Sequence, residues 1–271
     1  MRLAEPILAS WKADLALRFE ARGSRTVLAE RRSDGPLVVQ KSLHPEGEGV
    51  CHAIVVHPPG GIAGGDELTL DARAAPGAHA LLTTPGAGKW YRSSGAVASQ
   101  GLAFHAAGTL EWLPRETIVF NGAIARLATE VQLGPAGSYL GWEVACLGRA
   151  GCGERFERGS VRLSSRIVRE GRLLWSERGR IEGGGTLARS AAGLSGHSVF
   201  GTFVATIDAP KRSLVDACRE HAAVTHLPGL LVARYLGDAS EEAFERFTRL
   251  WMLLRPAVTS REAVLPRIWS T

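Results

Sequence analysis

The sequence of 271 residues predicts a mainly β protein that forms one domain, with two helices near its C-terminus. Short apolar or alternating segments recur at steps of about ten residues, and turn residues separate them, as in all-β proteins. No long helical pattern precedes position 210. A doubly wound α/β sheet needs a helix between successive parallel strands, so that class is excluded. The strands are then either antiparallel or wound into a solenoid or coil, and their spacing alone does not decide between the two.

The first expected strand shows the pattern most clearly. Its apolar side chains recur at every second position, the period of a half-buried strand, and they are Trp11, Ala13, Leu15, Leu17 and Phe19. Turn residues at 23–24 and 34–36 separate the next two strands. In chain order, the further strands are expected at residues 26–30, 37–40, 53–57, 67–72, 79–84, 101–105, 109–113, 118–120, 126–133, 138–146, 160–168, 173–177, 200–207 and 230–236.

The first of the two C-terminal helices is expected at roughly residues 213–225. Ser213 is a suitable N-cap, because its hydroxyl can accept a hydrogen bond from a free backbone N–H of the first turn. Residues 226–229 (HLPG) end the helical pattern. The helix is followed by a strand and then by the second helix.

The second helix is expected at roughly residues 238–255. Asp238 is a candidate N-cap, and Glu241 follows it three residues later, as in a capping box. Pro256 is expected to end the helix. One apolar face is formed at steps of three and four residues by Phe244, Phe247, Trp251 and Leu254. We expect this face to belong to the core, with a direct partner interface as the alternative. No linker divides the chain, so residues 1–271 are expected to form a single domain.

Composition and charge restrict the class of protein. Hydrophobic residues make up 45% of the chain, yet no run of about 18 apolar residues suggests a membrane span. Glu5, Lys12 and Asp14 interrupt any signal-peptide pattern, which favours the cytoplasm. Free thiols are expected of all four cysteines in that compartment, namely Cys51, Cys146, Cys152 and Cys218.

The net charge of +5 comes almost entirely from arginines that are spread along the chain. A solvated surface is the simplest interpretation, and a surface for acidic protein partners is the alternative. Nucleic acid ranks third, because the sequence contains no helix-turn-helix, zinc-finger or RNP-type motif.

Residues 57–66 (HPPGGIAGGD) form an unusual block of prolines and glycines between two expected strands. Such a block predicts a tight crossing in which backbone comes very close to other backbone or to a ligand. It does not fit the dinucleotide fingerprint, so packing is the better interpretation. Asp66 then emerges at the start of a strand, where it either faces a polar passage or accepts hydrogen bonds from nearby backbone amides.

No other motif indicates a catalytic or tightly bound cofactor site. Residues 83–89 (TTPGAGK) imitate a phosphate-binding loop, but Thr83 replaces the first glycine and Trp90 replaces the magnesium-binding hydroxyl. No zinc-type spacing or serine-hydrolase elbow is present. Three acids adjoin expected strands and, if buried together, could pass a hard or borderline cation through oxygen coordination; they are Asp66, Glu143 and Glu177. A small-ligand-binding or hydrolytic β enzyme that uses the glycine-rich loop and Asp66 is the alternative hypothesis.

Several motifs together carry a resemblance to a known family. In order, they are residues 35–40 (GPLVVQ), 57–66 (HPPGGIAGGD), 82–94 (LTTPGAGKWYRSS), 110–114 (LEWLP), 142–149 (WEVACLGR), 253–256 (LLRP) and 265–271 (LPRIWST). With these motifs the sequence resembles the UreD family of urease accessory proteins, also called UreH, over roughly residues 11–271. The motif residues that carry the resemblance are His57, Pro58, Pro59, Gly60, Gly61, Gly64, Gly65, Pro85, Gly86, Tyr91, Arg92, Arg149, Pro266, Arg267 and Trp269.

The resemblance implies a non-catalytic maturation factor whose fold is a helix-like coil of strands with two helices. It implies binding to apo-urease and to UreF, and through UreF to the GTPase UreG; a dimer of this accessory complex is one possible assembly. No cofactor is expected to bind tightly. Nickel is expected to pass transiently along an internal polar tunnel, and the family acids proposed to line it match Asp66, Glu143 and Glu177. One of these family positions can be Asp where this chain has Glu143.

Overall fold

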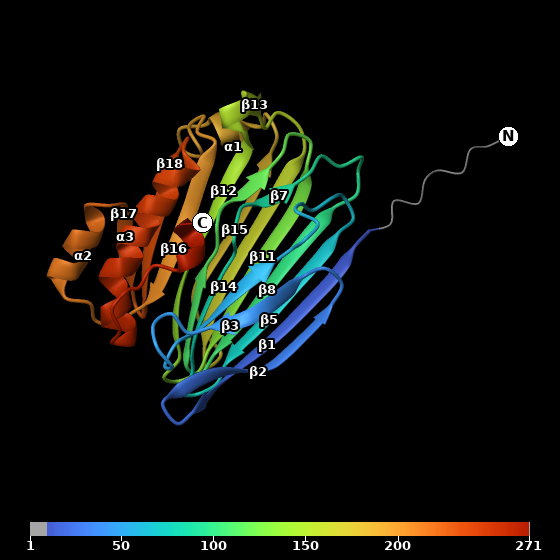
Figure 1. Ribbon diagram of the computed structural model, residues 1–271. Helices are drawn as coiled ribbons and strands as arrows, with labels where there is room; N and C mark the ends of the chain where they lie inside the picture. The colour runs from blue at the N-terminus through green and yellow to red at the C-terminus, as the bar shows by residue number, and fades with distance from the viewer. Residues whose placement is uncertain (1–9, 271) are drawn as a thin grey trace.

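Two β-sheets make up most of the protein in the computed structural model, which describes residues 10–270 (Figure 1). Residues 1–9 and 271, which the single-domain prediction includes, lie outside the described residues. The first sheet, here called sheet A, contains in spatial order β15 (Arg172–Glu182), β14 (Ser160–Arg169), β11 (Ile124–Leu133), β8 (Ala98–Ala106), β5 (Glu67–Ala74), β1 (Lys12–Arg22) and β2 (Arg25–Asp34).

The second sheet, sheet B, is the larger. Its main path runs through β17 (Ala223–Leu227), β18 (Leu230–Gly237), β16 (Val199–Thr206), β12 (Ser138–Arg149), β9 (Thr109–Leu113), β6 (His79–Thr83), β4 (Cys51–Val56) and β3 (Val38–Leu43). Beside this path β10 (Thr117–Val119) pairs with β12 and with β7 (Gly88–Trp90), and β13 (Glu154–Arg155) pairs with β12. Each expected strand overlaps an observed one, and β7, β13 and β17 are additional.

The chain winds as a coil, which settles the alternative that strand spacing left open. From β5 to β12 it alternates between the two sheets, so that each turn adds a strand to both. Strands β5, β8, β11 and β14 consequently pair in parallel in sheet A, and β4, β6, β9 and β12 do so in sheet B. Antiparallel pairs, such as β1–β2 and β14–β15, extend the coil at its margins.

The two-residue period of β12 divides the core into two layers. Tyr139 and Leu147 point between the sheets, where they join the first apolar core. Leu140 and Trp142 point to the opposite face of sheet B, where they join a second core beneath α2 (Arg212–Arg219) and α3 (Ser240–Thr259). Figure 1 shows both helices against the outer face of this sheet. The shorter helical segments are α1 (Thr186–Arg189), η1 (Ala150–Cys152) and η2 (Arg267–Ser270).

The expected bounds of the first C-terminal helix are wrong at its end. Helix α2 stops at Arg219, and residues that the prediction placed in its last turn begin β17 instead. Strand β17 forms an antiparallel pair with β18, so backbone hydrogen bonding across a hairpin overrides the weak helical pattern there. Ser213 is also not the N-cap, because the helix begins one residue before it and Lys211 occupies the cap position.

Two expectations about α3 are also corrected. The carboxylate of Asp238 accepts hydrogen bonds from the Ser198 backbone N–H at 2.9 Å and from its hydroxyl at 3.2 Å, so it caps a loop rather than the helix. Pro256 lies inside α3 rather than after it. The helix ends at Thr259, and the next residue, Ser260, has a left-handed backbone (φ 57°) and donates its N–H to the Pro256 carbonyl. The apolar face is core, as predicted: Phe247, Trp251 and Leu254 are fully buried, and Phe244 packs partly buried beside them.

A buried ionic network attaches α3 to sheet B. Arg255 donates through Nε to Glu111 of β9 at 3.0 Å, and through both terminal nitrogens to Glu46 at 2.6 and 2.9 Å. Trp251 Nε1 donates to the other oxygen of Glu111 at 2.5 Å. Two imidazoles complete the network. His79 Nε2 lies 2.5 Å from Glu111 Oε1, and His52 Nε2 lies 2.6 Å from Glu46 Oε1. Burial alone would raise the pKa of Glu111, but these partners outweigh it and hold that pKa below its ordinary value.

Removal of the central cation should destabilise the fold strongly. Arg255→Ala is expected to lower the free energy of unfolding by about 3–5 kcal/mol, because it leaves the fully buried Glu111 carboxylate without its permanent cation. Urea unfolding followed by tryptophan fluorescence measures the loss. Arg249→Ala is the matched control on the same helix; it breaks an exposed pair with Glu245 and should cost less than about 1 kcal/mol. Equal losses in the two variants would contradict this assignment.

Candidate functional site

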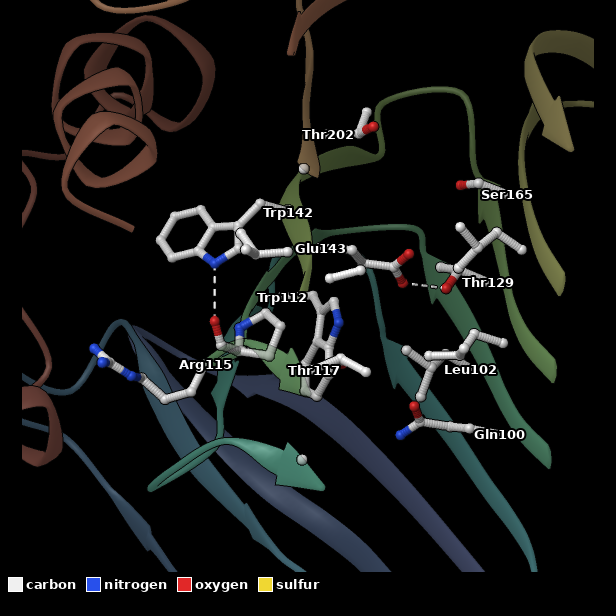
Figure 2. A pocket seen from close by; sticks show the side chains of 18 of the residues that line it. Gln100, Leu102, Trp112, Arg115, Thr117, Thr129, Trp142, Glu143, Ser165 and Thr202 are labelled. Carbon is white, nitrogen blue, oxygen red and sulfur yellow. Dashed lines mark hydrogen bonds between the residues drawn. The ribbon is translucent and has the colours of Figure 1, made fainter. Parts of the chain in front are cut away.

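A cavity of about 700 Å³ lies between the two sheets. Much of its wall is apolar, with Leu70 and Leu102 contributed by sheet A and Trp112 by sheet B. Polar side chains interrupt this wall, and Figure 2 labels Gln100, Thr129, Glu143, Ser165 and Thr202 among them. Glu177 and Arg234 line the same cavity. The cavity therefore has the character of a passage with a few polar positions rather than that of a fully hydrated groove.

Glu143 is the acid that lies deepest among these polar positions. It is on β12 between two residues that face the helices, so the strand alternation turns its side chain into the cavity. Thr129 of β11 donates a hydrogen bond to the carboxylate, and Figure 2 shows the two side chains reaching toward each other from opposite sheets. Burial raises the pKa of Glu143 above its ordinary value, the charge of Glu177 adds to this rise, and the hydrogen bond from Thr129 opposes it.

Glu177 lies at the rim of the same cavity, where the edge strand β15 of sheet A approaches β18 of sheet B. Arg234 of β18 donates to the Glu177 carboxylate at 2.6 Å and to the Thr202 hydroxyl at 2.9 Å. The guanidinium carbon of Arg234 also lies 5.3 Å from the centre of the Trp175 ring. Both charged side chains of this pair are partly exposed, so solvent screens their attraction. A cation that entered here would compete with Arg234 for Glu177.

Asp66 does not line the cavity. One of its carboxylate oxygens accepts the Trp11 backbone N–H at 2.8 Å, and the other accepts the Ala63 backbone N–H at 2.7 Å. Of the two roles considered for this side chain, the structure shows hydrogen bonding to nearby amides, and this closes the turn and holds the start of β1 against β5. A contact between Asp66 and nickel stays a prediction. The catalytic alternative gains no support, because both oxygens already serve the backbone.

The proline–glycine block allows close packing, as its composition predicts. A Cβ atom at Gly61 would lie 2.1 Å from the ring of Tyr91, and one at Gly64 would lie 2.4 Å from the Ser93 hydroxyl. His57 borders the cavity, and its buried Nε2 has no hydrogen-bond partner in the described part of the chain. Burial lowers the pKa of His57, while the charge of Asp66 acts in the opposite direction.

The other motif residues are spread over several contacts. Pro85 and Gly86 line the cavity beside the proline–glycine block. Arg149 pairs with Glu154 on the surface, and the Arg92 side chain lies against Gly122. Near the C-terminus, the Trp269 side chain donates to Thr83 at 2.9 Å, the Trp269 backbone N–H donates to the Pro266 carbonyl at 3.0 Å, and Arg267 begins η2. Prolines 58 and 59 follow β4 in the turn that leads into the glycines.

The cavity also contains polar residues that the sequence analysis did not single out. Thr129 and Ser165 occupy positions of β11 and β14 whose neighbours two residues away are apolar and face inward. A polar residue at a core-facing position is a detectable signal, and it becomes readable once the coil fixes which face is internal. Arg234 could not be found in this way, because its partner Glu177 is 57 residues away in the chain.

The side chains that could bind a metal ion do not form a closed metal centre. Within residues 10–270, no group of three or more His, Cys, Asp or Glu side chains is placed to hold a metal ion. The four cysteines are free, as expected, and three of them are buried. None of the helices described in the structure is long and apolar enough to cross a membrane. The arrangement therefore offers scattered carboxylate and hydroxyl oxygens, which suit weak and transient contact with a cation.

Comparisons with known proteins agree with the motifs. Residues 12–270 match the model of the family described as UreD urease accessory protein. A urease accessory protein UreD of Azoarcus sp. (strain BH72) is 55% identical over 269 residues, which cover 96% of this chain and 94% of that protein. Its counterpart in Dechloromonas aromatica (strain RCB) is 51% identical over 274 residues, with coverage of 97% and 95%. This chain therefore belongs to the UreD family of urease accessory proteins.

Proposed function

We propose that this chain is a non-catalytic scaffold for the maturation of urease, and that nickel ions pass through its internal cavity on their way to the enzyme. The observation that carries the proposal is the cavity between the sheets, with Glu143 inside it and Glu177 at its rim. The similarity to urease accessory proteins supports the process in which this chain is proposed to act.

The proposed partners are apo-urease and UreF, with the GTPase UreG joined through UreF, as the family resemblance implies. Nickel is cargo in this scheme, and the chain retains no tightly bound cofactor. Nucleotide hydrolysis belongs to the GTPase partner. This division of roles is consistent with a chain in which no phosphate-binding loop forms, since residues 83–89 lead into β7 and contribute to the cavity wall.

Scattered oxygen donors suit a cargo cation better than a closed site would. A transferred ion must bind well enough to enter and weakly enough to leave. Inside the cavity, the raised pKa of Glu143 means that burial disfavours its ionised form. An incoming cation would stabilise that ionised form, and the oxygens of Thr129 and Ser165 could complete a temporary set of ligands. The cation would leave readily, because the second acid of the cavity, Glu177, is already paired with Arg234.

Activation of urease is expected to require this chain. Co-expression of urease, UreF, UreG and this chain in nickel-supplemented cells should give active urease, and omission of this chain alone should lower the activity at least about tenfold, because apo-urease then lacks its scaffold. Urease activity and bound nickel are measured on the purified enzyme. Full activity after the omission would refute the proposed function.

A bulky side chain inside the cavity is expected to block the passage of nickel. Gly179 lines the cavity on β15, and the nearest atom to an added Cβ there lies 4.0 Å away, so a larger side chain can enter the cavity without a backbone clash. Gly179→Phe should greatly reduce urease activation and nickel content while the complex with UreF still co-purifies. Gly151→Phe is the matched control, because an added Cβ there meets nothing within 4 Å and Gly151 does not line the cavity. Full activation by Gly179→Phe would exclude this route for nickel.

The carboxylate of Glu143 is expected to make the stability of the protein depend on pH. Because the folded chain raises its pKa above the ordinary value of 4.5, the folded state holds this proton more tightly than the unfolded state does. Relative to Glu143→Gln, the wild type should therefore lose stability as the pH rises from about 4.5 through the raised pKa, and the difference should level off at higher pH.

Urea unfolding across this pH range measures the difference in the free energy of unfolding between the wild type and Glu143→Gln. Added Ni²⁺ should shrink the difference at neutral pH, because the cation stabilises the ionised carboxylate in the wild type only. A stability difference that does not vary with pH would show that Glu143 is not held in a desolvating position.

A further inference from the structure

The outer face of sheet A carries its charges unevenly. On β1, β2 and β5, the charged side chains are mostly balanced by ion pairs, such as Lys12 with Glu67 and Arg73 with Asp71. On β11, β14 and β15, arginines dominate instead. Five exposed arginines point outward there, and we call them the arginine face: Arg126, Arg162, Arg166, Arg178 and Arg180. The acids among them are Glu130, which lies 3.9 Å from Arg166, and Glu182, which pairs with Arg180.

The strand register places like charges directly opposite each other. Arg126 of β11 is the partner of Arg162 of β14, which is in turn the partner of Arg180 of β15. Directly opposed like charges destabilise a sheet. The side chains of Arg126, Arg162 and Arg178 form no ion pair or hydrogen bond within the described residues. Arg126 and Arg162 of this row therefore gain no stabilising ion pair in the isolated chain, and an anionic partner would relieve the repulsion between them.

The spacing and composition of the row favour an acidic helix over a nucleic acid. Adjacent strands lie about 4.8 Å apart, and side chains at steps of three and four residues on a helix are about 5–6 Å apart. Each guanidinium can bind a carboxylate with two parallel hydrogen bonds. The outward residues between the arginines are small or polar, as Ala128, Ser164 and Ser176 are, so the face offers no aromatic ring for stacking bases.

We propose that the arginine face docks a helix of a partner protein that carries acidic residues at steps of three and four positions. The site goes beyond the proposed function, because it lies on the outside of the coil, on the face of sheet A that points away from the cavity. A partner held there would leave both the cavity and the helical side of sheet B free.

The test uses the full-length chain and a fluorescent alanine-based peptide with glutamates along one helical face. Binding is followed by anisotropy at low and at physiological salt. Arg162→Glu should weaken binding about tenfold or more, since it replaces the centre of the row with a repelling charge. The same change should raise the melting temperature slightly, because the new carboxylate would lie between the two arginines on the neighbouring strands. A weaker interaction in a more stable protein cannot be ascribed to misfolding.

Arg32→Glu is the matched control. Arg32 is exposed on the same face of sheet A, where it pairs with Ala16 at the opposite margin of the sheet, and it has no ion pair within the described residues. Its replacement should change binding less than about twofold. The proposal is overturned if the two variants weaken binding equally, if the peptide does not bind, or if single-stranded DNA or anionic vesicles of matched charge bind as tightly as the peptide.

Discussion

The central strands of sheet B are buried on both of their faces, and this constraint governs the rest of the structure. One face borders the cavity and the other lies beneath α2 and α3, so a polar side chain on either face needs a partner. On the helical side, Glu111 meets Arg255 and Trp251. On the cavity side, Glu143 meets Thr129 of sheet A. The contact of Glu111 with Arg255 and the hydrogen bond between Glu143 and Thr129 therefore have the same physical cause, because a polar side chain on a buried face needs a partner.

The two acids differ in what surrounds them. Burial would raise the pKa of Glu111, but His79 and the permanent cation Arg255 together hold that pKa low and fix Glu111 as part of the framework. Burial raises the pKa of Glu143, the nearby charge of Glu177 adds to this rise and the hydrogen bond from Thr129 opposes it, and the ionised form of Glu143 lacks a built-in counter-charge. A buried acid with no resident cation is poorly suited to hold the fold together. It is well suited to interact with a cation that comes and goes.

The sequence predicted the class of fold well, because strand alternation and turn residues are local signals. It could not distinguish a coil from antiparallel sheets, since that choice depends on which distant strands pair. The helix errors have the same origin: residues 223–225 pair with β18, and Asp238 bonds to Ser198, 40 residues away. Glu143 and Glu177 were singled out by resemblance and do share a cavity. Asp66 has a local role that its place in the turn could suggest but not decide.

The placement of charge follows from the different exposure of the two sheets to solvent. Beneath α3, a cation must be matched with carboxylates, because no solvent screens it, and Arg255 accordingly binds two acids. On the open face of sheet A, water can screen a row of arginines, so the fold tolerates them without partners. Tolerance does not explain why the repulsion is concentrated on three adjacent strands while the rest of the same face is mostly balanced by ion pairs. The acidic partner proposed for the arginine face would account for that asymmetry, whereas folding alone does not.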